Sequence, residues 1–298
     1  MNKKWWLFCM VVLALSTAAC TKKIDAPEEV PALYTAFELA GKGQKLAEAG
    51  KWREAITQYN KIVVKFGKST NQDLQEEVAK ALYHKAEALL QLNKQDAATK
   101  TYDDLLSRFS KSNTPAVQVE VVKSLLDKAS IFGAQHQSDE ELKIYEEIIA
   151  RYGQSLAPNV QNQVSLAYNN KGFNLLLQAK QQWQNESSRN KLLSEALALF
   201  ELALKSSTTA EVKAYPLGNT AYSKWLLMRP SEANVPLREA LKLGGELIHK
   251  GEVDDTQQFT VPVDAGFVLL VNQTWDELHP KPKAKNSANS ANDKKINI

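Results

Sequence analysis

The side chains that could perform acid–base or metal chemistry are four histidines and many carboxylates. The histidines are His84, His136, His249 and His279. No two of them have the spacing of zinc ligands, and the sequence contains no phosphate loop, dinucleotide fingerprint or nucleophile elbow. Acidic runs such as residues 139–141 are typical of solvated helix faces. We therefore expect no enzyme activity, no metal site and no cofactor.

Both cysteines, Cys9 and Cys20, lie within the first twenty residues. The rest of the chain therefore has no thiol for a disulfide, a zinc site or a catalytic nucleophile. A short basic segment is followed by an apolar run over residues 5–15 and by small residues over 16–19, directly before Cys20. This order predicts a secretory signal peptide over residues 1–19, because the apolar run is too short to span a bilayer.

The small residues before Cys20 resemble the lipobox of bacterial lipoproteins, in which the cysteine is acylated, for example with palmitate, and becomes the new N-terminus. The chain departs from that pattern with Thr17, where the family usually has Leu. The alternative is an ordinary signal peptide cleaved near Ala19, with Cys20 a free thiol. The resemblance implies a lipid anchor in the bilayer, and Thr21 instead of Asp implies the outer membrane, facing the periplasm. Residues 20–31 are then predicted to be a flexible tether.

The bulk composition is that of a soluble globular protein, with 44% hydrophobic and 24% charged residues. The formal net charge is +3, and loss of Lys3 and Lys4 with the signal peptide would lower it to +1. No nucleic-acid partner is expected, because phosphate binding needs a clustered basic surface. Residues 281–298 are predicted to be a disordered tail whose lysines are solvated or contact anionic lipid or peptidoglycan.

A repeat of 43 residues organises the middle of the chain. Four columns recur in one register: Tyr59, Tyr102 and Tyr145; Phe66, Phe109 and Tyr152; Gly43, Ala86, Ala129 and Gly172; and Leu46, Leu89, Phe132 and Leu175. Each unit is predicted to be two helices, such as residues 74–92 and 97–109, joined by a turn. The small column would let two helices cross closely, and the aromatic residues would fill the gap to the next unit.

This pattern resembles the tetratricopeptide repeat (TPR) family. The matching residues are Gly43, Leu46, Gly50, Trp52, Ala55, Tyr59 and Ile62 in the first unit, and Leu82, Ala86, Leu89, Ala98, Tyr102 and Leu105 in the second. The third unit departs at Glu141, where a small residue is expected, so its helix pair is predicted to be looser. The resemblance implies an all-α, right-handed superhelical solenoid of about five helix pairs. Residues 32–205 would form the repeats, and residues 206–280 a degenerate repeat and a C-terminal capping helix.

The fourth and fifth units are irregular. Phe200 matches the aromatic column only if about twelve residues are inserted within 181–193, as a binding loop, a passive turn or an extended helix. In the fifth unit, helices are predicted over 214–228 and 235–249. The second of these would have Asn234 as its N-cap, Pro236 in its first turn and Gly251 at its end. A final helix is predicted over residues 262–278.

The family pattern implies a concave groove, built by the first helix of each unit, that binds a protein or peptide. The positions that the pattern assigns to this groove are Phe37, Gln44, Lys80, Tyr83, Glu87, Lys123, Asn169 and Phe173. Tyr83 and Phe173 are expected to be exposed aromatic anchors. Lys80, Lys123 and Asn169 resemble part of the clamp that some TPR proteins use to bind the C-terminal carboxylate of a partner, although the full set of clamp residues is absent. The insertion near Trp183 is the competing site.

The layout is similar to that of TPR lipoproteins that help to assemble envelope complexes. The leading hypothesis is therefore a periplasmic protein–protein interaction scaffold tethered to the outer membrane. The alternative is an immunity or inhibitor lipoprotein that neutralises a toxic effector in the periplasm, since such proteins also use lipid anchors and helical repeats. A more distant reading is a peptidoglycan-acting or glycan-binding protein.

Overall fold

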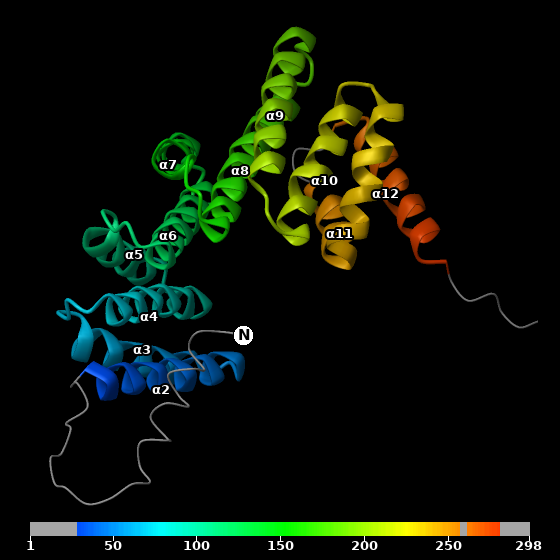
Figure 1. Cartoon of the computed structure of the whole chain (residues 1–298). Coiled ribbons are helices and arrows are strands. Elements are labelled where there is room, and N and C mark those ends of the chain that lie inside the picture. Colours follow the sequence, from blue (N-terminus) through cyan, green and yellow to red (C-terminus); the bar gives the residue numbers. More distant parts are fainter. Residues whose placement is uncertain (1–28, 257–260, 281–298) are drawn as a thin grey trace, which may run out of the picture.

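The computed structural model describes residues 29–256 and 261–280, which Figure 1 shows as a row of helices. The predicted signal peptide over 1–19, the predicted lipidation site Cys20 and the predicted tail over 281–298 lie outside the described residues. None of the helices in the described part combines the length and the hydropathy needed to cross a bilayer.

Eleven helices make up the regular structure of the described residues. They are α2 (Glu29–Glu48), α3 (Trp52–Phe66), α4 (Gln72–Gln91), α5 (Gln95–Phe109), α6 (Pro115–Ala134), α7 (Ser138–Tyr152), α8 (Pro158–Gln181), α9 (Glu186–Ser206), α10 (Ala210–Leu226), α11 (Pro230–Thr256) and α12 (Asp264–Leu278). Neighbours along the chain pack as five pairs, from α2 with α3 to α10 with α11, and α12 packs on α11. The predicted all-α solenoid of stacked helix pairs is confirmed.

The first helices of successive pairs form one continuous row. Within the described residues α2 packs on α4, α4 on α6, α6 on α8 and α8 on α10, whereas the second helices α3, α5 and α7 have no comparable packing with one another. Helices that approach each other closely lie on the inner side of a curved stack, and helices that splay apart lie on the outer side. The first helices therefore line the concave face (Figure 1).

The turn inside each of the first three pairs is closed by a residue in the left-handed region. Gly50 has a φ of 70°, Asn93 of 57° and His136 of 60°, and these positions share the 43-residue register. In the second pair, the N–H of Lys94 donates to the carbonyl of Leu89 at 2.9 Å, which satisfies one of the last carbonyls of α4. This turn is short, so Gln95 and Asp96, which were predicted to lie in the turn, already belong to α5.

The small-residue column lies at helix crossings, as predicted. A Cβ atom placed on Gly43 would lie 2.5 Å from the ring of Tyr59, and one on Gly172 would lie 2.6 Å from the ring of Phe200. Ala86 in the second pair is completely buried. At Gly43 and Gly172, the close approach of the aromatic ring of the same pair leaves no room for a Cβ atom.

The third pair accommodates Glu141 through a change on the facing helix. Gly133 of α6 stands at the register position that Leu90 occupies in α4, and a Cβ on Gly133 would lie 2.9 Å from a carboxylate oxygen of Glu141. The same carboxylate accepts hydrogen bonds from the Tyr145 hydroxyl at 2.8 Å and from the Asn174 amide at 3.2 Å. The larger residue therefore fills the space that the glycine leaves open, and its charge is solvated by two donors.

The residues added to the fourth pair lengthen its helices. The turn between α8 and α9 comprises only residues 182–185, and both helices are longer than their counterparts in the third pair. Trp183 in this turn is held by Arg189, whose guanidinium lies 4.5 Å from the indole ring and donates to the Trp183 carbonyl at 3.0 Å. Of the alternatives for the insertion, the structure shows extended helices joined by a short turn, and binding of a partner near Trp183 stays a prediction.

The predicted bounds of the last helices need correction. Helix α11 begins at Pro230, not after Asn234, because a proline at the first helical position loses no hydrogen bond. Pro236 consequently lies inside the helix, and Gly251 does not end it. The break falls at Gly245, whose φ of 56° and ψ of −141° are accessible to glycine alone. Helix α12 begins at Asp264, two residues after Pro262.

The buried core has two parts that meet within α8: the first includes Ala167 and the second Leu176. Polar side chains occupy the seam between them, where the Asn219 amide donates to Asn169 at 3.0 Å. The second part also holds a buried ion pair between Lys180 of α8 and Asp264 of α12, at 3.3 Å.

Candidate functional site

The predicted groove residues lie on four of the first helices. Phe37 and Gln44 are exposed on α2, Lys80, Tyr83 and Glu87 lie on α4, Lys123 on α6, and Asn169 and Phe173 on α8. The structure brings Tyr83, Glu87 and Lys123 together where α4 packs on α6. Gln44 donates to Glu48 within α2 at 2.9 Å, and Phe173 packs against the second part of the core.

Tyr83 is not the exposed anchor that the family pattern predicts. Its side chain is only 6% exposed, like Leu126 and Asn169 at the equivalent positions of the third and fourth pairs, which are 7% and 6% exposed. This column points at the neighbouring first helix, so its members hold consecutive repeats together. The ammonium of Lys123 lies 3.7 Å from the centre of the Tyr83 ring and covers it from the groove side.

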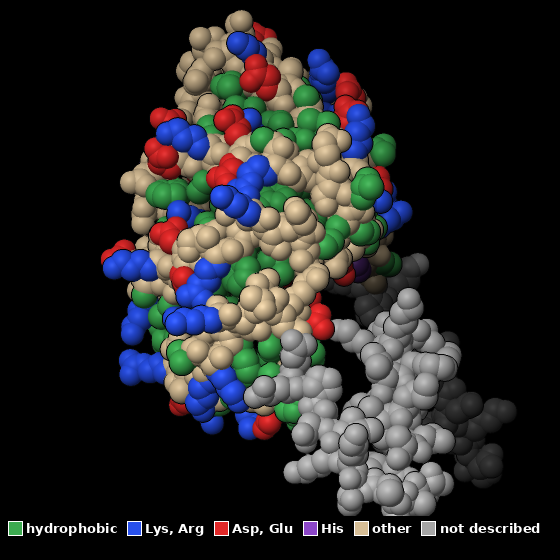
Figure 2. Space-filling model, turned by 60° about the vertical axis from the view of Figure 1, so that its left-hand side comes forward, with side chains coloured by type: hydrophobic (Ala, Val, Ile, Leu, Met, Phe, Trp, Pro, Cys, Tyr) green, Lys and Arg blue, Asp and Glu red, His purple; other side chains and the backbone are tan. Residues whose placement is uncertain are grey.

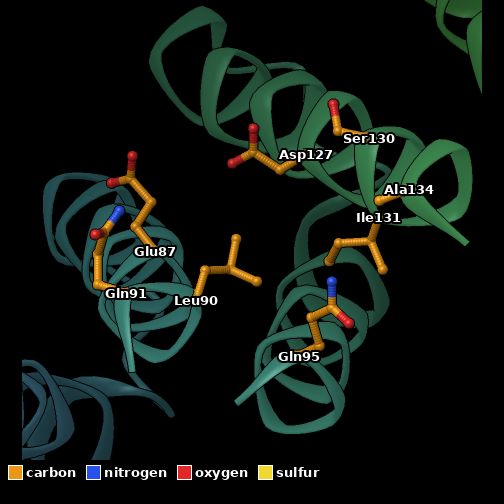
Figure 3. Close-up of a pocket in the computed structure, with 8 residues that line it drawn as sticks. All are labelled: Glu87, Leu90, Gln91, Gln95, Asp127, Ser130, Ile131 and Ala134. Carbon is orange, nitrogen blue, oxygen red and sulfur yellow. The ribbon is translucent and has the colours of Figure 1, made fainter. Parts of the chain in front are cut away.

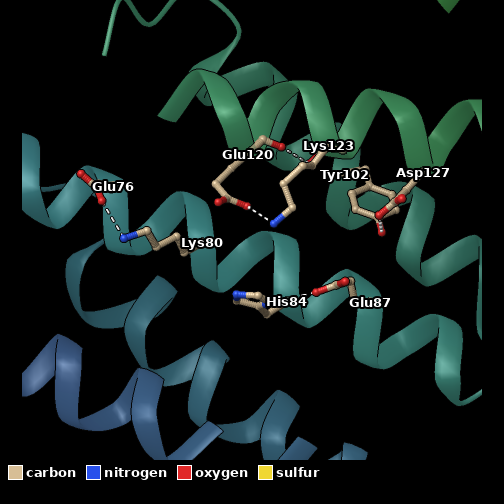
Figure 4. Close-up of polar contacts among 9 residues, drawn as sticks. Glu76, Lys80, His84, Glu87, Tyr102, Glu120, Lys123 and Asp127 are labelled. Atoms are coloured by element: carbon tan, nitrogen blue, oxygen red, sulfur yellow. Dashed lines mark hydrogen bonds and ion pairs between the residues drawn. The ribbon is translucent and has the colours of Figure 1, made fainter. Parts of the chain in front are cut away.

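Two glutamate–lysine pairs repeat along the face. Glu77 bonds Lys80 at 3.0 Å in α4. Glu120 bonds Lys123 at 3.1 Å in α6, and Figure 4 shows this pair together with the bond between Lys80 and Glu76. Glu76 adds a second bond to Lys80 at 2.6 Å, and these bonds hold the Lys80 pKa above its usual range, although burial acts in the opposite direction. Sequence reasoning missed Glu77 and Glu120, although their spacing of 43 residues, shared with the two lysines, could have revealed them.

A second polar group lies further along α4 and α6. The Tyr102 hydroxyl of α5 donates to the Asp127 carboxylate of α6 at 2.8 Å, and Glu87 bonds His84 at 2.7 Å. Burial raises the pKa of the Asp127 carboxyl above its ordinary value, and the hydrogen bond from Tyr102 acts against this rise. For Glu87, burial also disfavours the charge, but the hydrogen bond with His84 leaves its pKa below the ordinary value. The two carboxyl groups therefore differ in how easily each gives up its proton.

A cleft of about 320 Å³ opens beside these carboxylates. Its lining comes from the C-terminal halves of α4 and α6 and from the start of α5: Glu87, Leu90, Gln91, Gln95, Asp127, Ser130, Ile131 and Ala134. Figure 3 shows the carboxylates of Glu87 and Asp127 at one side of the cleft, with Leu90 and Ile131 facing each other across it. No lysine or arginine lines it. The cleft thus offers acceptors and an apolar floor, which suits a side chain of a bound polypeptide.

The described residues hold no group of three or more His, Cys, Asp or Glu side chains arranged to bind a metal ion. The polar contacts on the concave face are structural pairs, and no nucleophile is hydrogen-bonded to a general base within them.

Residues 80–112 match the model of the tetratricopeptide repeat family, a segment that covers α5 and the second half of α4. No curated protein matches the chain. Among solved structures, the chain is similar to a putative kinesin light chain from Podosopora anserina with nearly identical TPR-like repeats, and to a single-residue variant of it. The identity is 14% in both cases, over 70% of this chain and 95% of the other, with TM-scores of 0.44 and 0.45.

The family match falls on the second helix pair, and the neighbouring pairs repeat its architecture in the same register. The matched segment is thus similar to one tetratricopeptide repeat, and the neighbouring helix pairs form a TPR-like stack around it. Such stacks generally bind other proteins along the long face that their repeats leave uncovered, and they are typically not catalysts.

Proposed function

We propose that this protein is a membrane-anchored interaction scaffold that binds a partner protein or peptide on the concave face of its first helices. The cleft between α4 and α6 is the observation that carries the proposal. It opens between two of the first helices, half of its lining belongs to the segment that matches the TPR family, and it combines two carboxylates with apolar side chains. Lys80 and Lys123 bond glutamates, whereas the two carboxylates of the cleft form no ion pair with a lysine or arginine of the described residues.

The proposed location is the outer membrane, with the solenoid facing the periplasm. Its support is the order of basic, apolar and small residues before Cys20 in the sequence. An acyl chain on Cys20 would hold the protein at the bilayer, although stable anchoring commonly requires a second membrane contact or acyl chain.

The cleft is tested by filling it without disturbing the core. Ser130 is exposed on α6 and bonds only the carbonyl of Leu126, so Ser130→Arg should close the cleft and leave the fold intact. Ser107→Arg is the matched control, because Ser107 is an exposed helical serine at the outer surface of α5. Partners are captured from solubilised membranes and identified by mass spectrometry.

We expect Ser130→Arg to weaken capture by about tenfold or more and Ser107→Arg to leave it unchanged. Equal capture by both variants would remove the cleft as the binding site. The identity of the captured protein decides between the two roles: an envelope-assembly protein fits the scaffold, and a toxic effector fits an immunity protein.

The anchor is tested separately. Cys20→Ser should release the protein from membranes or stall its processing, because the acylated sulfur would be lost. Unchanged membrane fractionation together with normal N-terminal maturation would show that Cys20 is not the anchor.

A further inference from the structure

The outer surface of the first helix pair departs from the charge pattern of the next two. In α5, Asp104 bonds Arg108 at 2.7 Å, and the same positions of α7 carry an ion pair at 2.6 Å between Glu147 and Arg151. The equivalent positions of α3 are Lys61 and Lys65. An attractive pair at i and i+4 is thus replaced by two cations, whose mutual repulsion disfavours the helix.

These lysines are exposed and are not neutralised within the described chain. Lys61, Lys65 and Lys68 form no ion pair in the described residues, and Lys61 bonds only the neutral amide of Gln58, at 3.3 Å. Val64 lies between them with 85% of its surface exposed. Figure 2 shows blue Lys and Arg side chains gathered at the lower end of the molecule, which α2 and α3 form in Figure 1.

A shallow groove accompanies the lysines along the junction of α2 and α3. It is lined by Thr35, Leu39, Thr57, Asn60, Lys61, Val64 and Lys65, and no carboxylate is among them. The nearby acid on α2, Glu38, bonds Lys42 at 2.6 Å, and Glu54 lies in the opposite, first turn of α3. The surface therefore presents apolar atoms between unpaired positive charges, which matches an anionic interface.

The position of this surface indicates which anionic interface it meets. Thr35 near the start of α2 and Val64 near the end of α3 line the same groove, so the lysines lie at the end of the pair where the chain enters from Cys20. The residues between Cys20 and Glu29 can span at most about 30 Å. If Cys20 carries the anchor, the lysines cannot lie far from the bilayer surface.

We propose that Lys61, Val64, Lys65 and Lys68 (the α3 docking face) rest on the anionic lipid headgroups of the membrane that holds the anchor. The inference rests on the proposed acylation of Cys20 and adds a second, electrostatic contact to it. Anionic lipid attracts lysines near its surface within about a Debye length. The first pair then stands on the membrane, and the later pairs extend from it.

The test uses the full, processed protein mixed with two kinds of vesicle, phosphatidylcholine alone and phosphatidylcholine with phosphatidylglycerol. After flotation, exposed lysines are modified with an amine-reactive reagent and quantified by mass spectrometry. Lys61, Lys65 and Lys68 should react about fivefold more slowly on the anionic vesicles. This factor corresponds to about 1 kcal/mol, the attraction of one lysine to an anionic membrane surface. Lys100, Lys143 and Lys205, exposed on the outer helices of later pairs, serve as internal references.

Lys61→Asp restores the charge pattern of the later pairs. It should abolish the protection of Lys65 and Lys68 while leaving α3 as stable as before or more stable, because the new aspartate would face Lys65 as Asp104 faces Arg108. Lys100→Asp makes the same change of charge on α5 and should leave the protection intact. A loss of protection in the Lys61 variant thus cannot be attributed to unfolding.

The outcomes separate docking from anchoring. Flotation with both vesicles but equal lysine reactivity overturns the α3 docking face and leaves the anchor standing. Flotation with the anionic vesicles alone overturns the anchor and supports docking. Flotation with neither kind of vesicle overturns both the anchor and the docking face. Protection of Lys65 and Lys68 that persists in Lys61→Asp also rules out the α3 docking face.

Discussion

The hydroxyl of Tyr102 donates a hydrogen bond at 2.8 Å to the carboxylate of Asp127, which belongs to the next repeat. The bond crosses the boundary between the second and third helix pairs, from α5 to α6. Because repeats in a solenoid contact only their neighbours, the stability of the stack depends on such boundary contacts.

Removal of this hydroxyl tests the boundary. Tyr102→Phe keeps the ring in its fully buried place and leaves a partly buried carboxylate without its donor, so the free energy of unfolding should fall by about 1–3 kcal/mol. Tyr59→Phe is the control, since it stands in the same register column and its hydroxyl has no hydrogen bond in the described structure. Chemical denaturation measures both. Equal losses would show that the bond to Asp127 contributes nothing.

The raised pKa of Asp127 predicts a pH dependence. Because the folded state binds the proton more tightly than the unfolded state, this group favours folding at low pH, and its contribution is lost as the pH rises through the folded pKa. Asp127→Asn abolishes the titration and keeps an acceptor for Tyr102. The variant should therefore gain stability relative to the parent as the pH rises from the ordinary aspartate value to neutrality. If the difference in the free energy of unfolding between variant and parent stays constant across that pH range, the prediction is contradicted.

Two glycines on α2 should respond to alanine in opposite ways. At Gly43 the added methyl would meet the ring of Tyr59 at 2.5 Å, so Gly43→Ala should destabilise the protein by about 1–3 kcal/mol. At Gly41 a Cβ would meet nothing within 4 Å, so Gly41→Ala should stabilise α2 by about 0.5–1 kcal/mol through helix propensity. Thermal melting of the two variants measures whether each one loses or gains stability. A gain in stability for both would show that the Tyr59 ring does not pack against Gly43.

The two lysines of α8 should differ in their effect on stability. Lys180 forms a buried pair with Asp264, so Lys180→Met leaves a buried charge without its partner and should cost about 3–5 kcal/mol. Lys171 bonds Glu146 at 2.8 Å near the surface, so Lys171→Met should cost at most about 1 kcal/mol. Hydrogen exchange should locate the loss in α10–α12. A loss spread evenly along the solenoid would show that the two parts of the core unfold together.

The register of 43 residues was sufficient to predict the stacked pairs, since it follows from side chains that must pack: the small residue at the crossing and the aromatic ring opposite. The same register also contains the Glu77–Lys80 and Glu120–Lys123 pairs, but sequence alone does not distinguish these glutamates from the solvated acidic residues that helices commonly carry. Periodicity shows which positions recur but not which neighbour each position faces.

That distinction explains the error at Tyr83. The family pattern assigns its column to the groove, but the angle between consecutive first helices decides whether a side chain points outward or at the next helix. The start of α11 was misplaced for a local reason. Asn234 and Pro236 form a plausible helix start, yet Pro230 satisfies the same rule four residues before Asn234, and only the packing of α11 on α10 selects the longer helix.

The contact between Gly133 and Glu141 restricts the order in which these two positions can change. A leucine at position 133, as at Leu90 in the preceding repeat, would collide with the carboxylate of Glu141, which lies 2.9 Å from where its Cβ would stand. An alanine at position 141 would instead leave a void beside Gly133 and remove the acceptor of Tyr145. Each single substitution should therefore destabilise the third pair. Only the two changes together, leucine at position 133 and alanine at position 141, lead to the arrangement of the second repeat. Even Gly133→Ala would place its methyl 2.9 Å from that carboxylate, so the side chain of Glu141 would have to shift before any larger residue could stand at position 133.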